Sequence, residues 1–123
     1  MPEGVHFNCI GAHTLGKQEF DPTILKRASK IVVDDIEQAV HNGEINVPLS
    51  KGMIKRNDIY GELGEIVTEF KKGRENDSEI TVFASTGLAT QDAEVASLVY
   101  DNAVKKGVGL RGRLVMQSPN IRQ

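Results

Sequence analysis

The residues with the clearest chemical potential stand in a glycine-containing stretch that runs from Cys9 to Pro22. His13 carries an imidazole whose ordinary pKa of about 6.5 lets it accept and return a proton at neutral pH. Lys17 carries a cation that can meet a phosphate or a ribose. Each has a plainer alternative, because His13 can hydrogen-bond its own turn and Lys17 can be an ordinary solvated lysine. Proton transfer and anion binding are therefore the chemistry to look for on this loop.

A second polar turn, Ser85-Thr86-Gly87, separates an apolar run from a helix-periodic segment. Two hydroxyl groups and the free N–H groups of a helix N-terminus can hold a polar ligand there. The alternative is that the turn only caps the following helix. Parallel strands bring the loops that follow them to the same edge of a sheet, so we expect this turn and the loop of His13 to lie close together.

Continuous apolar runs alternate with helix-periodic segments, and this alternation predicts the elements that position the two loops. The runs predict strands over 5–10, 31–34 and 80–84, and the longer periodic segments predict helices over 22–29, 58–70 and 88–106. Asp21 and Pro22 are expected to begin the first helix, as its N-cap and first helical residue.

Weaker patterns complete the series of elements. A short helix over 36–41 is expected to end at Asn42-Gly43, and the stretch 44–55, which contains Pro48, is expected to be irregular. The resulting order β-α-β-α-α-β-α predicts an α/β sandwich around a parallel sheet of about three strands. Such a sheet leaves one edge open unless another chain covers it.

Composition and charge argue against several function classes. With 123 residues the chain is one domain at most. Its 15 basic and 17 acidic residues give a net charge of −2, without a basic stripe beside aromatic residues, so no nucleic acid partner is expected. A single cysteine excludes an intrachain disulfide and indicates a cytoplasmic protein. No metal-ligand spacing and no run of membrane-spanning length occurs, so neither a metal site nor a membrane is expected.

The segment Gly107–Gly112 has the G-x-G-x-x-G spacing of a dinucleotide-binding turn. That fingerprint works when a strand delivers the glycines to the start of a helix, whose free N–H groups hold the pyrophosphate. Here the glycines follow a predicted helix. We therefore expect Gly107 to end that helix and the spacing to be coincidental.

The segment Ile10–Asp21 resembles the pattern G-A-[D/H]-x-P-G-K-x-E-L-D, with Leu15 at the position of the usual proline. That pattern belongs to the ornithine cyclodeaminase/μ-crystallin family, and the archaeal alanine dehydrogenase branch is the most similar. The resemblance covers nearly everything from Val5 to Gly109. Further matches follow in order at Val32–Asp34, Gly43–Ile45, Glu62–Glu65, Gly73–Thr81 and Ser85–Asp92.

The resemblance implies roles for the residues of both loops. It implies contacts to a nicotinamide dinucleotide, NAD or NADP, from Ile10, Gly11, Ala12, Lys17 and Ser85. It puts His13 where the cyclodeaminases have a catalytic aspartate, and Thr86 beside the substrate. Family members convert a small amino acid to its imine by passing a hydride to the nicotinamide. Histidine in place of aspartate keeps a proton acceptor but changes its charge and reach.

The resemblance covers only the later part of a family subunit, which begins with a substrate-binding and dimerisation region and a glycine-rich dinucleotide turn. It implies the second half of a Rossmann-type sheet with a long C-terminal helix: a partial NAD(P)-binding domain over 1–109 and a basic tail over 110–123. The isolated chain is expected to be inactive and to bind the dinucleotide weakly or not at all. Three alternatives stay open. One is an enzyme part completed by a chain with the N-terminal half, and another is a non-catalytic module that forms a homo-oligomer such as a dimer. The third is a small-ligand binder similar to a lens crystallin, which is less favoured because its pocket would be shared with the other part of the subunit.

Overall fold

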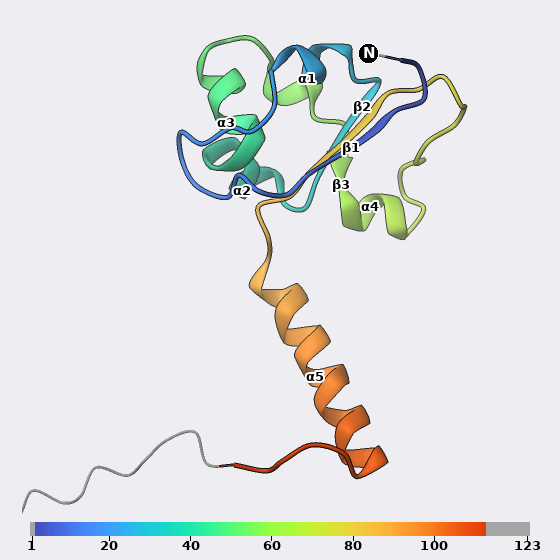
Figure 1. The fold of residues 1–123 in the computed structure, drawn as a ribbon. Coiled ribbons are helices and arrows are strands. Elements are labelled where there is room, and N and C mark those ends of the chain that lie inside the picture. Colours follow the sequence, from blue (N-terminus) through green and yellow to red (C-terminus); the bar gives the residue numbers. More distant parts are fainter. Residues whose placement is uncertain (1, 113–123) are drawn as a thin grey trace, which may run out of the picture. The chain divides into compact units, whose positions relative to one another are not determined.

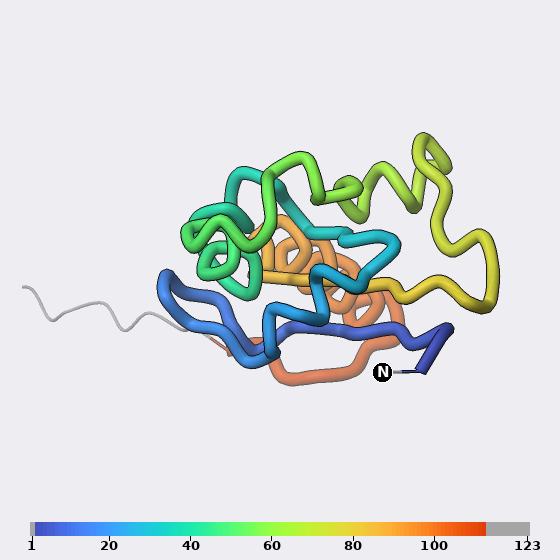
Figure 2. Tube along the Cα trace, turned by 90° about the horizontal axis from the view of Figure 1, so that it is seen from above, coloured from blue at the N-terminus to red at the C-terminus, as the bar shows by residue number. Residues whose placement is uncertain are grey.

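Four parallel strands form one sheet in the computed structural model, which describes residues 2–112 (Figure 1). The strands are β1 (His6–Cys9), β2 (Lys30–Val33), β3 (Gly61–Glu62) and β4 (Thr81–Ala84). Their order in the sheet is β1-β4-β2-β3, so β4 pairs with both β1 and β2 although it comes last in the chain. Figure 2 shows β4 running between the blue β1 and the cyan β2. The α/β fold and its parallel sheet are confirmed.

One face of the sheet is covered by three helices, α1 (Thr23–Arg27), α2 (Ile36–His41) and α3 (Gly43–Ser50). Figure 1 shows them together on one side, with the short α4 (Leu63–Val67) on the other. Alternate strand residues point into the first layer and are buried there. This core includes Cys9, Leu25, Ile31, Val33, Ala39, Ile45, Val82 and Ala84. Burial of each larger aliphatic side chain contributes roughly 1.5–3 kcal/mol.

The helix predicted over 58–70 is wrong in extent. The segment instead contains a 3₁₀ turn η1 (Arg56–Asp58), then β3 and α4. The apolar residues of this segment pack on both faces of the sheet. Ile59 joins the core beside α1–α3, whereas Leu63 and Ile66 lie over the opposite face. Tyr60 interrupts any helix here, because its N–H donates to the carbonyl oxygen of Ile31 in β2 at 2.8 Å.

The stretch 44–55 is not irregular throughout, because its first residues form α3. Pro48 lies inside this helix and is buried. A proline disrupts a helix mainly by removing one N–H and crowding the preceding turn. In α3 it is the sixth of eight residues, so the carbonyl oxygen of Glu44, four residues earlier, receives no helical hydrogen bond from position 48. The predicted helix end at Asn42 is confirmed, since Asn42 is the C-cap of α2.

Residues of the second compact unit, from Ala89 onward, form α5 (Ala89–Lys106). The predicted helix end at Gly107 is confirmed. Gly107 has φ +63°, its N–H donates to Val104 O at 3.2 Å, and the N–H of Val108 donates to Ala103 O at 3.0 Å. These are the two hydrogen bonds of a glycine-terminated helix. The G-x-G-x-x-G spacing therefore follows a helix, and residues 113–123 of the predicted tail lie outside the described residues.

Candidate functional site

The two predicted loops meet at the carboxyl edge of the sheet. β1 leads into the loop of residues 10–22, here called the His13 loop, and β4 leads into Ser85-Thr86-Gly87, here called the Ser85 turn. The N–H of Ser85 donates to Cys9 O at 2.9 Å. Gly43, at the start of α3, touches both loops: a Cβ added there would lie 2.7 Å from Ala12 O and 2.7 Å from Thr86 Cγ2. The expected proximity of the two loops is therefore present.

His13 is exposed at this edge, and its Nδ1 lies 3.2 Å from the carbonyl oxygen of Gly11. A carbonyl oxygen only accepts, so Nδ1 carries the proton and Nε2 of the neutral ring is left as an acceptor. The plainer alternative, a histidine bonded to its own turn, is thus realised. It leaves the imidazole able to take a proton at Nε2.

The other residues of the His13 loop differ in what they can offer a ligand. Ile10 is 64% exposed, Gly11 and Lys17 are also exposed, and Ala12 is buried with 2% exposed. Ala12 therefore presents almost no surface to a ligand, with its side chain or its backbone. A side chain at Gly11 would overlap the carboxylate of Glu19, so the backbone passes close to that group.

Two buried side chains of α3 hold the His13 loop. The carboxylate of Glu44, 3% exposed, accepts hydrogen bonds from the N–H groups of Glu19 at 2.6 Å and Phe20 at 3.2 Å. Asn46 Oδ1 accepts from the N–H of Gly16 at 3.1 Å. Sequence reasoning missed both residues because it expected no helix there. A signal was present: acidic and amide residues directly follow the Asn42-Gly43 helix end.

One buried carboxylate at the end of β2 holds the Ser85 turn. Asp34, 7% exposed, accepts at Oδ2 from Ser85 Oγ at 2.8 Å, Thr86 N at 2.9 Å and Gly87 N at 2.7 Å. Gln38 of α2 donates from Nε2 to Thr86 Oγ1 and to Gly87 O, both at 2.9 Å. Asp34 occupies the N–H groups of Thr86 and Gly87, so these two groups are not free to bind a ligand. Ser85 and Thr86 are themselves half-buried.

Cys9 ends β1 directly beneath the site but has no nucleophilic role. It is 2% exposed, and burial raises the pKa of its thiol to about 12, with the nearby carboxylates of Glu44 and Glu19 adding to the shift. A thiolate is the reactive form of cysteine, so this side chain is an inert part of the core.

Within residues 2–112 no group of three or more histidine, cysteine, aspartate or glutamate side chains is arranged to hold a metal ion. In the same part of the chain, no helix combines the length and apolarity needed to cross a bilayer.

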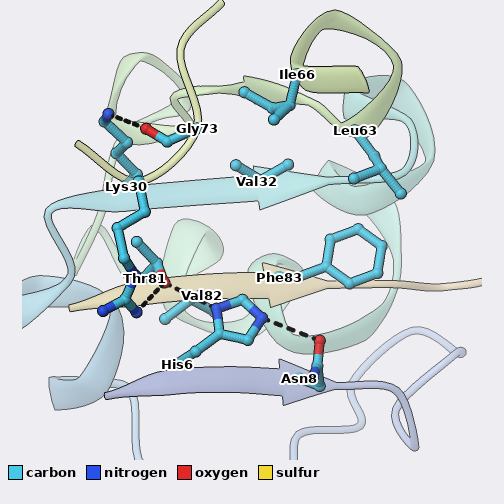
Figure 3. A pocket seen from close by; sticks show the side chains of 11 residues that line it. His6, Asn8, Lys30, Val32, Leu63, Ile66, Gly73, Thr81, Val82 and Phe83 are labelled. Atoms are coloured by element: carbon cyan, nitrogen blue, oxygen red, sulfur yellow. Dashed lines mark hydrogen bonds between the residues drawn. The ribbon is translucent and has the colours of Figure 1, made fainter. Parts of the chain in front are cut away.

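A hollow of about 330 Å³ lies away from this edge, on the sheet face opposite α1–α3. Figure 3 shows Val32 and Phe83 on the sheet below Leu63 and Ile66 of α4, with His6 bonded to Asn8 and Thr81 at one end. None of the predicted site residues lines it. The hollow is mostly apolar and separate from the two loops.

The family model of the ornithine cyclodeaminase/mu-crystallin family matches residues 1–107. The chain belongs to this family. It is 59% identical over 109 residues to the alanine dehydrogenase of Archaeoglobus fulgidus, an alignment that covers 89% of this chain and 34% of that protein. The chain thus spans about a third of the length of its curated relatives and corresponds to a C-terminal portion of them.

Solved structures agree with this family assignment. An archaeal alanine dehydrogenase dimer with bound NAD matches with a TM-score of 0.82 and 55% identity, over 93% of this chain and 35% of that one. The Δ¹-pyrroline-2-carboxylate reductase of Thermococcus litoralis, in complex with NADH and L-proline, matches with a TM-score of 0.84 and 40% identity, over 91% and 35%. The fold is therefore that of part of a Rossmann-like dehydrogenase.

Proposed function

We propose that this chain forms the nicotinamide side of an NAD(P)-linked oxidoreductase that interconverts a small amino acid and its imine. The observation that carries the proposal is the meeting of the His13 loop and the Ser85 turn across Gly43. The carboxyl edge of a parallel sheet is where such folds bind ligands. Membership of the family, and relatives with NAD or NADH bound, support the same assignment.

In this proposal different residues at the carboxyl edge contact the cofactor, contact the substrate and accept the proton. The surfaces that contact the dinucleotide are those of Ile10, Gly11, Ala12, Lys17 and Ser85. Thr86 lies beside the substrate, and His13 takes up at Nε2 the proton that the amino group loses. The nicotinamide, when bound, accepts the hydride from the substrate carbon. His13 is exposed, and among residues 2–112 its side-chain hydrogen bond uses Nδ1, which fits a proton acceptor that works in contact with a ligand.

Binding by the isolated chain is expected to be weak. The pyrophosphate of a dinucleotide is normally held by free N–H groups at a helix N-terminus. At the Ser85 turn, which precedes α5, Asp34 occupies the N–H groups of Thr86 and Gly87, so these two groups add no phosphate contact. The remaining contacts must offset several kcal/mol of association cost. We expect a dissociation constant on the order of millimolar or higher for NAD.

The test is a titration of the 123-residue chain with NAD⁺ and NADH, followed by calorimetry and by the amide signals of the two loops in NMR spectra. Millimolar binding that weakens in His13→Ala and Lys17→Ala would support the proposal. Lys26→Ala, an exposed lysine on α1, is the matched control and should change nothing. Shifts confined to residues outside the two loops, or equal weakening in all three variants, would contradict it.

We further propose that the protein is cytoplasmic and works as an assembly, either as a homo-oligomer or with a chain that supplies the rest of a family subunit. Two observations favour assembly. β1 is an edge of the sheet within the described residues, with unpaired backbone groups on its outer side. Large apolar side chains of α5, including Val95, Leu98 and Val99, are about 60% exposed. Light scattering of the chain, alone and mixed with the N-terminal two thirds of a relative, distinguishes the two forms, and a monomer under both conditions contradicts this proposal.

A further inference from the structure

We propose that Asp34 is a positioning residue that makes the Ser85 turn a site for a hydrogen-bond donor, an amide NH₂ or an ammonium group, and closes it to phosphate. Asp34 belongs to neither loop and would not touch the ligand. It acts through the hydroxyl groups and backbone of the turn. Assigning the donor to the nicotinamide carboxamide or to a substrate amino group rests on the proposed function; the exclusion of phosphate does not.

The first step is the direction of each hydrogen bond. A carboxylate has no proton to give, so Asp34 accepts in each of its hydrogen bonds. Its Oδ1 accepts from the N–H of Asp35 at 3.2 Å, and its other hydrogen bonds come from donors of the turn. Ser85 Oγ donates its only proton to Oδ2 at 2.8 Å, and Thr86 Oγ1 lies 3.4 Å from Oδ1, pointing its proton the same way. The N–H groups of Thr86 and Gly87 are bound at 2.9 and 2.7 Å. These four donors point toward Asp34, and the fifth donor of the turn, the N–H of Ser85, is bonded to Cys9 O at 2.9 Å.

The second step is what the turn still presents outward. Thr86 Oγ1 also accepts from Gln38 Nε2, and Ser85 Oγ accepts from the N–H of Gly87 at 3.2 Å. A hydroxyl oxygen has two acceptor positions, so one remains on each oxygen. The turn thus offers acceptors and no donors. A phosphate or carboxylate, which needs donors, finds none, whereas an amide NH₂ or an ammonium finds two oxygens.

The negative charge of Asp34 acts in the same direction as its hydrogen bonds. Asp34 is 7% exposed, so solvent screens its negative charge less than that of a surface carboxylate. No lysine or arginine is paired with it among the described salt bridges. The residual negative field reinforces the preference for a donor or a cation over an anion.

The test is an NMR titration of the full chain with inorganic phosphate, nicotinamide and L-alanine as three separate probes, read at the amides of the Ser85 turn. Phosphate should leave these signals unmoved, and nicotinamide or alanine should shift them, the responding probe identifying the source of the donor. In Asp34→Asn the carboxamide can no longer accept all four donors. Phosphate should then shift the turn, and affinity for the responding donor should fall by about threefold to tenfold.

Asp35→Asn is the matched control, because the neighbouring carboxylate caps α2 through Gln38 N and does not bond to the turn. It should leave all three probe responses as in the parent chain. Ser85→Ala keeps Asp34 in place, so it tests the loss of one outward oxygen even if Asp34→Asn unfolds. A phosphate shift in the parent chain, no shift with either donor, or equal effects of Asp34→Asn and Asp35→Asn would overturn the inference. If alanine shifts the turn but NAD binds nowhere on the chain, the proposed function fails and the role of Asp34 stands.

Discussion

Loops at the two edges of the sheet are held by side chains of opposite charge. At the carboxyl edge the carboxylates of Asp34 and Glu44 accept from backbone N–H groups of the two candidate loops. At the amino edge the loop before β4 is held by cations that donate to backbone carbonyls. Lys30 Nζ donates to Gly73 O, and Arg74 Nη1 donates to Gly4 O at 2.7 Å.

The edges also differ in how tightly the partners are enclosed. Asp34 and Glu44 are short, buried side chains that fix the loop backbone directly. Lys30 is buried as well, but its nearer carboxylate partner Glu75 is 46% exposed, and Arg74 is exposed. The second partner of Lys30, Glu79, is 14% exposed but lies 3.7 Å away. Long side chains with solvated partners restrain a loop loosely. The loops at the carboxyl edge are therefore held in a defined geometry, whereas the loop at the amino edge is attached to the sheet less rigidly.

The largest loss of stability is expected from Gly43→Ala, because Gly43 lies where the two candidate loops meet. Gly43 has φ +70°, and its Cβ would lie 2.7 Å from Ala12 O and from Thr86 Cγ2. Gly52 has a similar φ of +66° but nothing within 4 Å of its Cβ. Gly52→Ala should cost about 1 kcal/mol, and Gly43→Ala about 1–3 kcal/mol more. Urea denaturation measures both, and equal costs would show that the loops do not need this close approach.

An intermediate effect is expected when a carboxylate is neutralised at each edge. Glu44→Gln leaves a carboxamide NH₂ facing backbone N–H groups in a buried place and should cost about 1–3 kcal/mol. Glu75→Gln at the amino edge removes an anion whose pKa is lowered chiefly by its hydrogen bond from Lys30, but water can replace that contact. Glu75→Gln should therefore lower the free energy of unfolding by clearly less than Glu44→Gln. Denaturation midpoints compare the two, and a larger loss for Glu75→Gln would reverse the interpretation of the edges.

The smallest effect concerns pH and Cys9 beneath the carboxyl edge. The pKa of the folded thiol is raised from 9.0 to about 12, so the unfolded state loses this proton first. The neutral thiol makes its full contribution to the free energy of unfolding below pH 9, and this contribution is lost as the pH rises from 9 toward 12. The loss should reach about 1 kcal/mol at pH 10. Cys9→Ala should remove this part of the alkaline slope, and slow alkylation of Cys9 in the folded chain at pH 8 is the accompanying check.

Most of the architecture could be predicted from the sequence, because strands and helices bury residues at regular spacings. The runs around Val33 and Val82 are strands, and α5 ends at Gly107 as its glycine indicates. The failure at 58–70 has a physical cause. Ile59 and Leu63 are four residues apart, as on one helix face, yet they serve opposite faces of the sheet. Spacing cannot distinguish one face from two when a short strand interrupts the segment.

The sequence by itself determined that parallel strands deliver His13 and Ser85 to one edge, because the alternation of strands and helices requires that chain direction. It also determined the family, through motifs that lie close together in the chain. Only the tertiary structure decided that β4 enters between β1 and β2 and that Asp34, 51 residues before Ser85, holds the turn. A hydrogen bond between distant residues leaves no periodic pattern in the sequence. The residues that orient the candidate site therefore became visible only once the chain was folded.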